Sequence, residues 1–192
     1  MMNRLLGFLL LFCLLFSGAS FAEKPTETAL QQGVLLKARD GLPDPRFHNS
    51  LVLLVQHDQQ GSVGLVVNRP SRLPLADILP EDFGFSVAGE TISYGGPVEP
   101  ETLLVLIYTS DEIPAESDRV DDNLYLTGLD GLRGWQQAQG QGAFRVFTGY
   151  AGWGAGQLEQ ELLQEDWQPV PFDLEIVLGR KTDANKQRPS QG

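Results

Sequence analysis

Cysteine and histidine are scarce in this sequence. Its 192 residues include one cysteine, Cys13, and two histidines. Cys13 lies in an apolar N-terminal run, so a mature chain that has lost this run contains no thiol. Disulfide bonds, thiol catalysis and zinc–thiolate sites are therefore excluded for that mature chain, and its stability must come from a buried core.

Basic residues are also few. Fourteen lysines and arginines oppose 25 aspartates and glutamates, which leaves a formal charge of -11 at pH 7. This charge repels the phosphates of nucleic acids and anionic lipid headgroups, so we expect no general nucleic-acid binding. The length, together with a hydrophobic share of 42%, suits one globular domain and is too short for two.

Long hydrophobic runs are confined to the N terminus. A short positive leader, residues 1–4, precedes an unbroken apolar run at 5–16, and small residues follow up to Ala22. This layout is typical of a secretory signal peptide, and the run is shorter than the roughly 20 residues of a membrane-spanning helix. We therefore expect a signal peptide over 1–22, cleaved after Ala22, and a periplasmic protein without a stable membrane span. Retention of the leader as an anchor is the alternative.

Polar composition marks both ends of the remaining chain. Residues 23–32 contain Pro25 and few apolar side chains, and residues 180–192 contain no large apolar side chain. Such segments do not bury enough surface to fold, so we expect 180–192 to be a disordered basic tail. The single folded domain is predicted over 33–179.

Strand-like and helix-like patterns alternate irregularly within this domain. Apolar runs at 50–57 and 62–68 flank a turn-like tetrapeptide and predict an antiparallel hairpin, with Pro70 ending its second strand. The patterns also predict a short helix at 75–79, a helix at 129–139 and strands at 91–94, 102–109 and 123–127.

The last predicted unit is a strand, a glycine loop, a helix and a closing strand. These elements cover residues 144–150, 151–156, 157–167 and 170–178. Hairpins mixed with a few helices, without regular β-α-β alternation, predict an α+β fold. We expect two layers, with two or three helices packed on a largely antiparallel sheet.

Three stretches, taken together, resemble a known family. They are residues 42–70, the YGGPV string at 94–98 and the GYAGWGAGQLEQE string at 149–161. In order and spacing they are similar to the YqgE/AlgH family of bacterial proteins, over about 33–167. The resemblance implies a two-layer α/β fold and no established enzymatic activity, hence no catalytic residues. It also leaves a cytoplasmic regulator as an alternative if the leader is not a signal.

Glycines and aromatic residues gather in these stretches and form the candidate site. Its residues are Asn68, Arg69, Tyr94, Gly95, Gly96, Pro97, Tyr150, Gly152, Trp153, Gly154, Gly156 and Gln157. The glycines either floor a pocket walled by Trp153 or let the loop pack on the sheet. Arg69 either pairs with a carboxylate or recognises an anionic group on a partner. We predict a non-enzymatic binding or regulatory module for a protein or small molecule, without cofactor or metal.

The histidines support a second hypothesis, a periplasmic hydrolase or metal-dependent enzyme. It uses His48, His57 and Asp58, or the carboxylates of Glu161 and Glu165 one helical turn apart. Such chemistry requires side chains to converge within about 3 Å of a shared atom or proton. The spacing of the two histidines places them on opposite faces of one strand, and the leucines of the helix predict that both glutamates face solvent.

Overall fold

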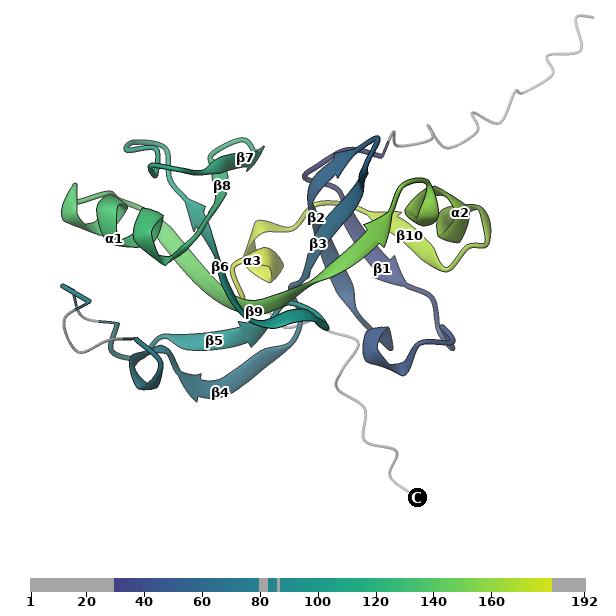
Figure 1. Cartoon of the computed structure of the whole chain (residues 1–192), viewed down its shortest axis with the longest axis horizontal. Coiled ribbons are helices and arrows are strands. Elements are labelled where there is room, and N and C mark those ends of the chain that lie inside the picture. The colour runs from purple at the N-terminus through teal and green to yellow at the C-terminus, as the bar shows by residue number, and fades with distance from the viewer. Residues whose placement is uncertain (1–29, 80–82, 86, 181–192) are drawn as a thin grey trace, which may run out of the picture.

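One long strand, β9 (Ala143–Gly154), organises the fold (Figure 1). The computed structural model describes residues 30–79, 83–85 and 87–180. The first half of β9 pairs antiparallel with β6 (Val98–Tyr108) and parallel with β5 (Thr91–Tyr94). Its last four residues pair antiparallel with β3 (Gly61–Val66). The strand therefore belongs to two sheets and joins them.

The first sheet has the order β10, β1, β2, β3, β9. Its other strands are β1 (Leu35–Ala38), β2 (Leu51–Asp58) and β10 (Trp167–Val170). The second sheet contains β4 (Pro70–Pro74), β5, β9, β6, β8 (Leu124–Thr127) and β7 (Asp118–Asp121). The β5–β9 pair is parallel and all other pairs are antiparallel, which confirms the largely antiparallel sheet.

Three α-helices occur in the described part of the chain. They are α1 (Leu129–Gln137), α2 (Gln157–Leu163) and α3 (Leu174–Val177). Helix α1 contacts β6 and β8, and α2 contacts β9, β10 and β3. Two short 3-10 helices, η1 (Pro45–Phe47) and η2 (Leu75–Asp77), precede β2 and follow β4. The fold is α+β, as expected.

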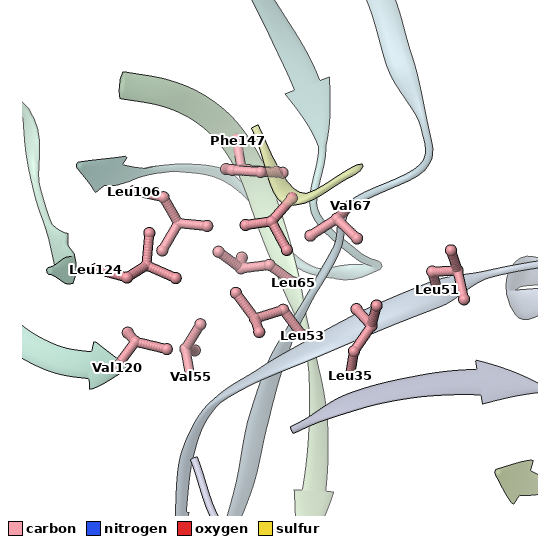
Figure 2. Close-up of a cluster of buried hydrophobic side chains, with 11 residues drawn as sticks. Leu35, Leu51, Leu53, Val55, Leu65, Val67, Leu106, Val120, Leu124 and Phe147 are labelled. Atoms are coloured by element: carbon pink, nitrogen blue, oxygen red, sulfur yellow. The ribbon is translucent and has the colours of Figure 1, made fainter. Parts of the chain in front are cut away.

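Within the described segments, apolar side chains form three buried clusters. The cluster in Figure 2 joins the two sheets: Leu53 and Leu65 come from the first, Leu106 from the second, and Phe147 from the shared strand. A second cluster lies beneath α2 and contains two tryptophans. The third lies beneath α1 and includes Leu132 of that helix. Burial of apolar surface is the main favourable contribution to folding.

Elements with strong local patterns are confirmed. The predicted hairpin corresponds to β2 and β3, β5 has the predicted bounds, and α1 begins at the predicted residue. The segment predicted as a helix at 75–79 contains η2. These elements are encoded by neighbouring residues, because turn composition and apolar spacing are local properties.

Several predicted boundaries are wrong: β6, for example, begins at Val98 and not at 102, and four further differences stand out. Residues Ala151 to Gly154 continue β9 and do not form a loop, because they pair with β3. Helix α2 ends at Leu163, and Glu165 adopts a left-handed backbone angle (φ 59°) before β10 begins. The segment 170–178 is the end of β10 followed by α3, and not one strand. Pro70 begins β4, which lies beside β5.

The predicted leader at 1–22 lies outside the described residues, and so does nearly all of the predicted tail. The first residue of that tail, Arg180, belongs to the fold: its backbone N–H donates to the Glu175 carbonyl at 2.8 Å. Its guanidinium lies 3.6 Å from the Glu175 carboxylate. Across the residues that the structure describes, no helix is both long enough and apolar enough to cross a membrane.

Candidate functional site

Two of the predicted site segments cross at their glycines. The Gly95 N–H donates to the Thr148 carbonyl at 2.8 Å, which seats the segment before β6 against β9. A Cβ atom on Gly95 would lie 2.3 Å from the Gly149 carbonyl oxygen, and one on Gly96 would lie 2.1 Å from the Tyr150 carbonyl carbon. Gly149 also has a left-handed backbone (φ 62°). Only glycine allows the two backbones to approach so closely, so these glycines serve packing.

Beside this crossing, β6 and β9 present an open patch. We call Val98, Glu99, Tyr150 and Gly152 the junction patch. Val98 lies opposite Tyr150 in the ladder and is 36% exposed. Gly152 is exposed, and a Cβ atom there would meet only the Tyr150 ring at 3.5 Å and Val98 at 3.7 Å. At this patch, the exposed apolar side chain of Val98 therefore lies next to the bare backbone of Gly152.

A tyrosine–carboxylate hydrogen bond completes the junction patch. The Tyr150 hydroxyl donates to the Glu99 carboxylate at 3.1 Å. Partial burial, and then the hydrogen bond to Glu99, raise the pKa of Tyr150 above its ordinary value. Glu99 itself has a left-handed backbone (φ 45°) at the start of β6. Glu99 was not predicted as a site residue, whereas Val98 belongs to the predicted surface only as the last residue of the YGGPV string.

Trp153 lies on the buried side of the same strand. It is 7% exposed, and its indole N–H donates to Glu161 at 2.9 Å. The Trp167 indole N–H donates to the same carboxylate oxygen at 2.8 Å. The two indoles pack edge to face with centroids 5.6 Å apart. Of the two alternatives raised for Trp153, the structure shows packing: the side chain is buried and does not form the wall of an open pocket.

Gln157 and Glu161 tie α2 to the end of β9. The Gln157 amide donates to Glu161 at 2.8 Å and accepts from the Gly154 backbone N–H at 3.0 Å. Glu161 thus accepts three side-chain hydrogen bonds and is half-buried, so the prediction that it faces solvent is wrong. Glu165 is exposed, as predicted. Gly156 is exposed and left-handed (φ 73°) at the start of α2.

Asn68 and Arg69 hold the turn between η1 and β2. The Asn68 amide donates to the Asn49 carbonyl at 2.7 Å and accepts from the Leu51 backbone N–H at 3.0 Å. Arg69 Nη2 donates to the His48 carbonyl at 3.1 Å. Its guanidinium lies 5.9 Å from the centroid of the Tyr94 ring. Pro97, half-buried, connects this region to the junction patch.

Arg145 is a buried cation that sequence patterns did not single out. Its guanidinium donates to the Ser93 hydroxyl at 2.9 Å and to the carbonyls of Val67 and Val177 at 2.7 and 2.9 Å. It stacks 4.8 Å from the Phe147 ring centroid. Burial lowers the pKa of Arg145 to about 10. The side chain thereby holds α3 on the sheets, which is a structural role.

The two histidines lie at opposite ends of β2: His48 comes three residues before the strand begins, and His57 is its penultimate residue. His48 Nε2 is 2.7 Å from the Leu42 carbonyl oxygen. His57 Nδ1 is 2.8 Å from the Ser62 hydroxyl, and its Nε2 is 3.9 Å from Glu159. Six residue steps of strand separate Leu51 from His57 and span about 20 Å, so the two imidazoles do not converge. The two-histidine form of the hydrolase hypothesis therefore lacks a shared reacting atom.

Asp58 closes the β2–β3 turn. Its carboxylate accepts from the Gln56 amide at 2.9 Å and from the Gln60 backbone N–H at 2.7 Å. These two hydrogen bonds lower the pKa of Asp58. Within 30–79, 83–85 and 87–180, no group of three or more histidine, aspartate or glutamate side chains is arranged to hold a metal ion.

Comparison with known proteins places the chain among relatives of similar length. A family model described as AlgH-like matches residues 35–188. A UPF0301 protein of Xylella fastidiosa (strain 9a5c) is 38% identical over 170 residues, covering 85% of this chain and 88% of that protein. A UPF0301 protein of Thiobacillus denitrificans is 39% identical over 147 residues, covering 74% and 78%.

Solved structures agree with the sequence matches. The solution structure of the AlgH protein from Pseudomonas aeruginosa has a TM-score of 0.63 and 30% identity, covering 81% of this chain and 84% of that one. A crystal structure of a Corynebacterium diphtheriae protein has a TM-score of 0.67 and covers 78% and 80%. Its 21% identity supports the fold alone. By family model, identity and fold, this chain belongs to the AlgH-like family, whose function is not established.

Proposed function

We propose that this protein is an exported, non-enzymatic binding module that holds a protein or small-molecule partner at the junction patch. One observation carries the proposal: Val98 is 36% exposed beside the bare backbone of Gly152. A partner that covers this surface gains apolar burial without displacing a side chain. The Tyr150–Glu99 pair at its edge supplies a polar group that orients the partner.

The glycine crossing supports this role because it pre-organises the patch. Gly95, Gly96 and Gly149 bring β6 and β9 into backbone contact directly beside Tyr150. A surface that is already ordered loses less conformational entropy on binding. Tyrosine is also favoured in binding surfaces, since it offers a large apolar ring and a hydroxyl.

Photocrosslinking from the patch tests the binding role. A photoreactive amino acid at Val98 in intact cells is expected to form an adduct, read as a mass increase of the chain. The same amino acid at Leu163, which is 85% exposed on α2, is the matched control and is expected to form none. Gly152→Leu is expected to block the adduct at position 98, because its side chain covers the patch. Equal adducts at both positions, or none, contradict the proposal.

Export rests on the leader pattern and on the thiol-free mature chain. A mature chain that begins at Glu23 is expected in the periplasmic fraction, measured by mass spectrometry of its N-terminal peptide. A full-length chain found in the cytosol would instead favour the cytoplasmic regulator. This measurement does not depend on the junction patch.

A further inference from the structure

Arg69 is an arginine without an acidic partner in an acidic fold. Five other arginines each lie within 4 Å of a carboxylate: Arg39, Arg46, Arg119, Arg133 and Arg180. Among the described residues, Arg69, Arg72 and the buried Arg145 have no such contact. Residues 33–179 contain 22 acidic and eight basic side chains. With so many carboxylates in the domain, an unpaired arginine that is also held in place is informative.

The Arg69 guanidinium is fixed by contacts that leave its charge unneutralised. Its Nη2 donates to the His48 carbonyl at 3.1 Å, and its carbon lies 5.9 Å from the Tyr94 ring centroid. The Tyr94 backbone N–H donates to the Arg69 carbonyl at 3.0 Å, which ties the two residues together. Nε and Nη1 have no acceptor in the described chain and are not buried, so they face solvent. Nη2 also keeps a second N–H, which lies parallel to either the Nε–H or an Nη1–H. One edge of this planar cation therefore presents two adjacent free donors with little freedom.

Asp44, whose partner Arg46 lies near Tyr94, does not compete for this cation. Asp44 is engaged by Arg46 through three side-chain hydrogen bonds of 2.7 to 3.1 Å. Its carboxylate also accepts from the Arg46 backbone N–H at 2.9 Å. The Asp44–Arg46 ion pair therefore has no net charge. Arg46 and Arg69 both lie near Tyr94: the pKa of Arg46 is raised mainly by Asp44 and less by Tyr94.

We propose that Arg69, stacked beside Tyr94, is a recognition site for a carboxylate group of a ligand. Two adjacent N–H donors match the two oxygens of a carboxylate. A single positive charge balances one carboxylate, whereas phosphate carries about -1.5 to -2 near pH 7 and is repelled more strongly by an acidic protein. The site uses different residues from the junction patch and does not rest on it.

NMR titration of the purified protein tests this site through the Arg69 Nε–H resonance. The probes are an end-blocked peptide of glutamates, acetate and inorganic phosphate, at matched ionic strength. A saturable shift of this resonance is expected with a carboxylate probe, and phosphate is expected to bind more weakly. Tighter binding of the peptide than of acetate assigns the carboxylate to a protein, and equal binding assigns it to a small molecule.

Variants separate recognition from structural support. Arg69→Gln is expected to weaken carboxylate binding about tenfold or more, because it removes a charge-assisted hydrogen bond. Arg72→Gln, a neighbouring arginine without the stack, is the control and is expected to bind as the parent does. Since the titration of the parent protein needs no variant, poor folding of Arg69→Gln leaves the test intact.

Three results would overturn the carboxylate site. They are no saturable shift with either carboxylate probe, phosphate binding as tightly, or an equal loss in Arg72→Gln. Photocrosslinking at Val98 is expected to be unchanged in Arg69→Gln, so the failure of either proposal can be recognised separately.

Discussion

The two sides of the end of β9 differ sharply. On one side, Ala151 and Trp153 are buried beneath α2, and Trp153 donates to Glu161. On the other side, Tyr150 is half-buried and packs against the cluster of Figure 2, whereas Gly152 and Gly154 are exposed. All five residues come from one glycine-rich string, in which a strand was predicted up to Tyr150 and a loop over 151–156. The difference shows that the pleat of a strand, and not a loop, divides this motif into a packing side and an open side.

The comparison also separates two uses of glycine. At Gly95, Gly96 and Gly149 the missing side chain makes room for a second backbone. At Gly152 it leaves open surface, since a Cβ atom there would make only ordinary van der Waals contacts. Glycine therefore allows close backbone packing at the crossing and leaves open surface at the patch. Substitution by alanine should destabilise the protein at the first position type and not at the second.

Trp153→Ala tests the buried side and should have the largest effect. The substitution leaves a cavity beneath α2 and removes a donor to Glu161, so we expect a loss of about 3–5 kcal/mol in the free energy of unfolding. Denaturant unfolding measures it. Tyr150→Ala on the open side is the matched variant, with an expected loss of about 1 kcal/mol. A larger loss for Tyr150→Ala would reverse the assignment of the two sides.

Gly149→Ala tests the crossing and should have an intermediate effect. Its Cβ atom would lie 2.5 Å from the Gly96 carbonyl oxygen in a backbone with φ 62°. Overpacking and backbone strain together predict a loss of about 2–4 kcal/mol in the free energy of unfolding. The control, Gly152→Ala, should stay within about 0.5 kcal/mol of the parent, because its site has room. Similar thermal melting of the two variants would show that the crossing tolerates a side chain.

Titration of Tyr150 tests the open side. Its pKa shift should have the smallest effect of the three on the stability of the protein. Partial burial and the Glu99 hydrogen bond raise its pKa above 10.0, so its phenolate should form at higher pH than that of a free tyrosine. A raised pKa in the folded state contributes stability below the unfolded pKa, and this contribution is lost as pH rises through the folded pKa.

Ultraviolet titration of the parent protein against Tyr150→Phe isolates this phenol. Glu99→Gln should lower the pKa of Tyr150 toward its ordinary value, because it removes the negative charge that opposes ionisation. An unchanged titration in Glu99→Gln would mean that the hydrogen bond does not act on the phenol.

Much of the fold was predictable where neighbouring residues encode it. The β2–β3 hairpin, β5 and α1 were predicted from turn composition and apolar spacing. The end of β9 was missed because three glycines in five residues are typical of a loop, and only pairing with β3 makes this segment a strand. The alternation of tyrosine, alanine, glycine and tryptophan at 150–153 was the available signal.

The candidate site was predicted in part. Segments 94–98 and 149–152 do meet, as their shared composition suggested. Glu99 and Arg145 were missed, since nothing in their neighbourhood indicates that a distant donor or acceptor will reach them. Glu161 was considered, but as a solvent-facing side chain and not as the acceptor for two indoles. The Tyr150 hydroxyl and Glu99 are 51 positions apart, and Arg145 meets Ser93 across 52.

By itself, the sequence determined the local strands and helices, the acidic balance and the confinement of its one thiol to the apolar leader run, because these depend on composition and on short-range pattern. Folding alone fixes which glycines are crossed by another backbone, which face of β9 is covered by α2, and which arginines lack a carboxylate. These properties depend on strands and side chains that meet only after the chain has folded, and short-range pattern carries no record of such partners.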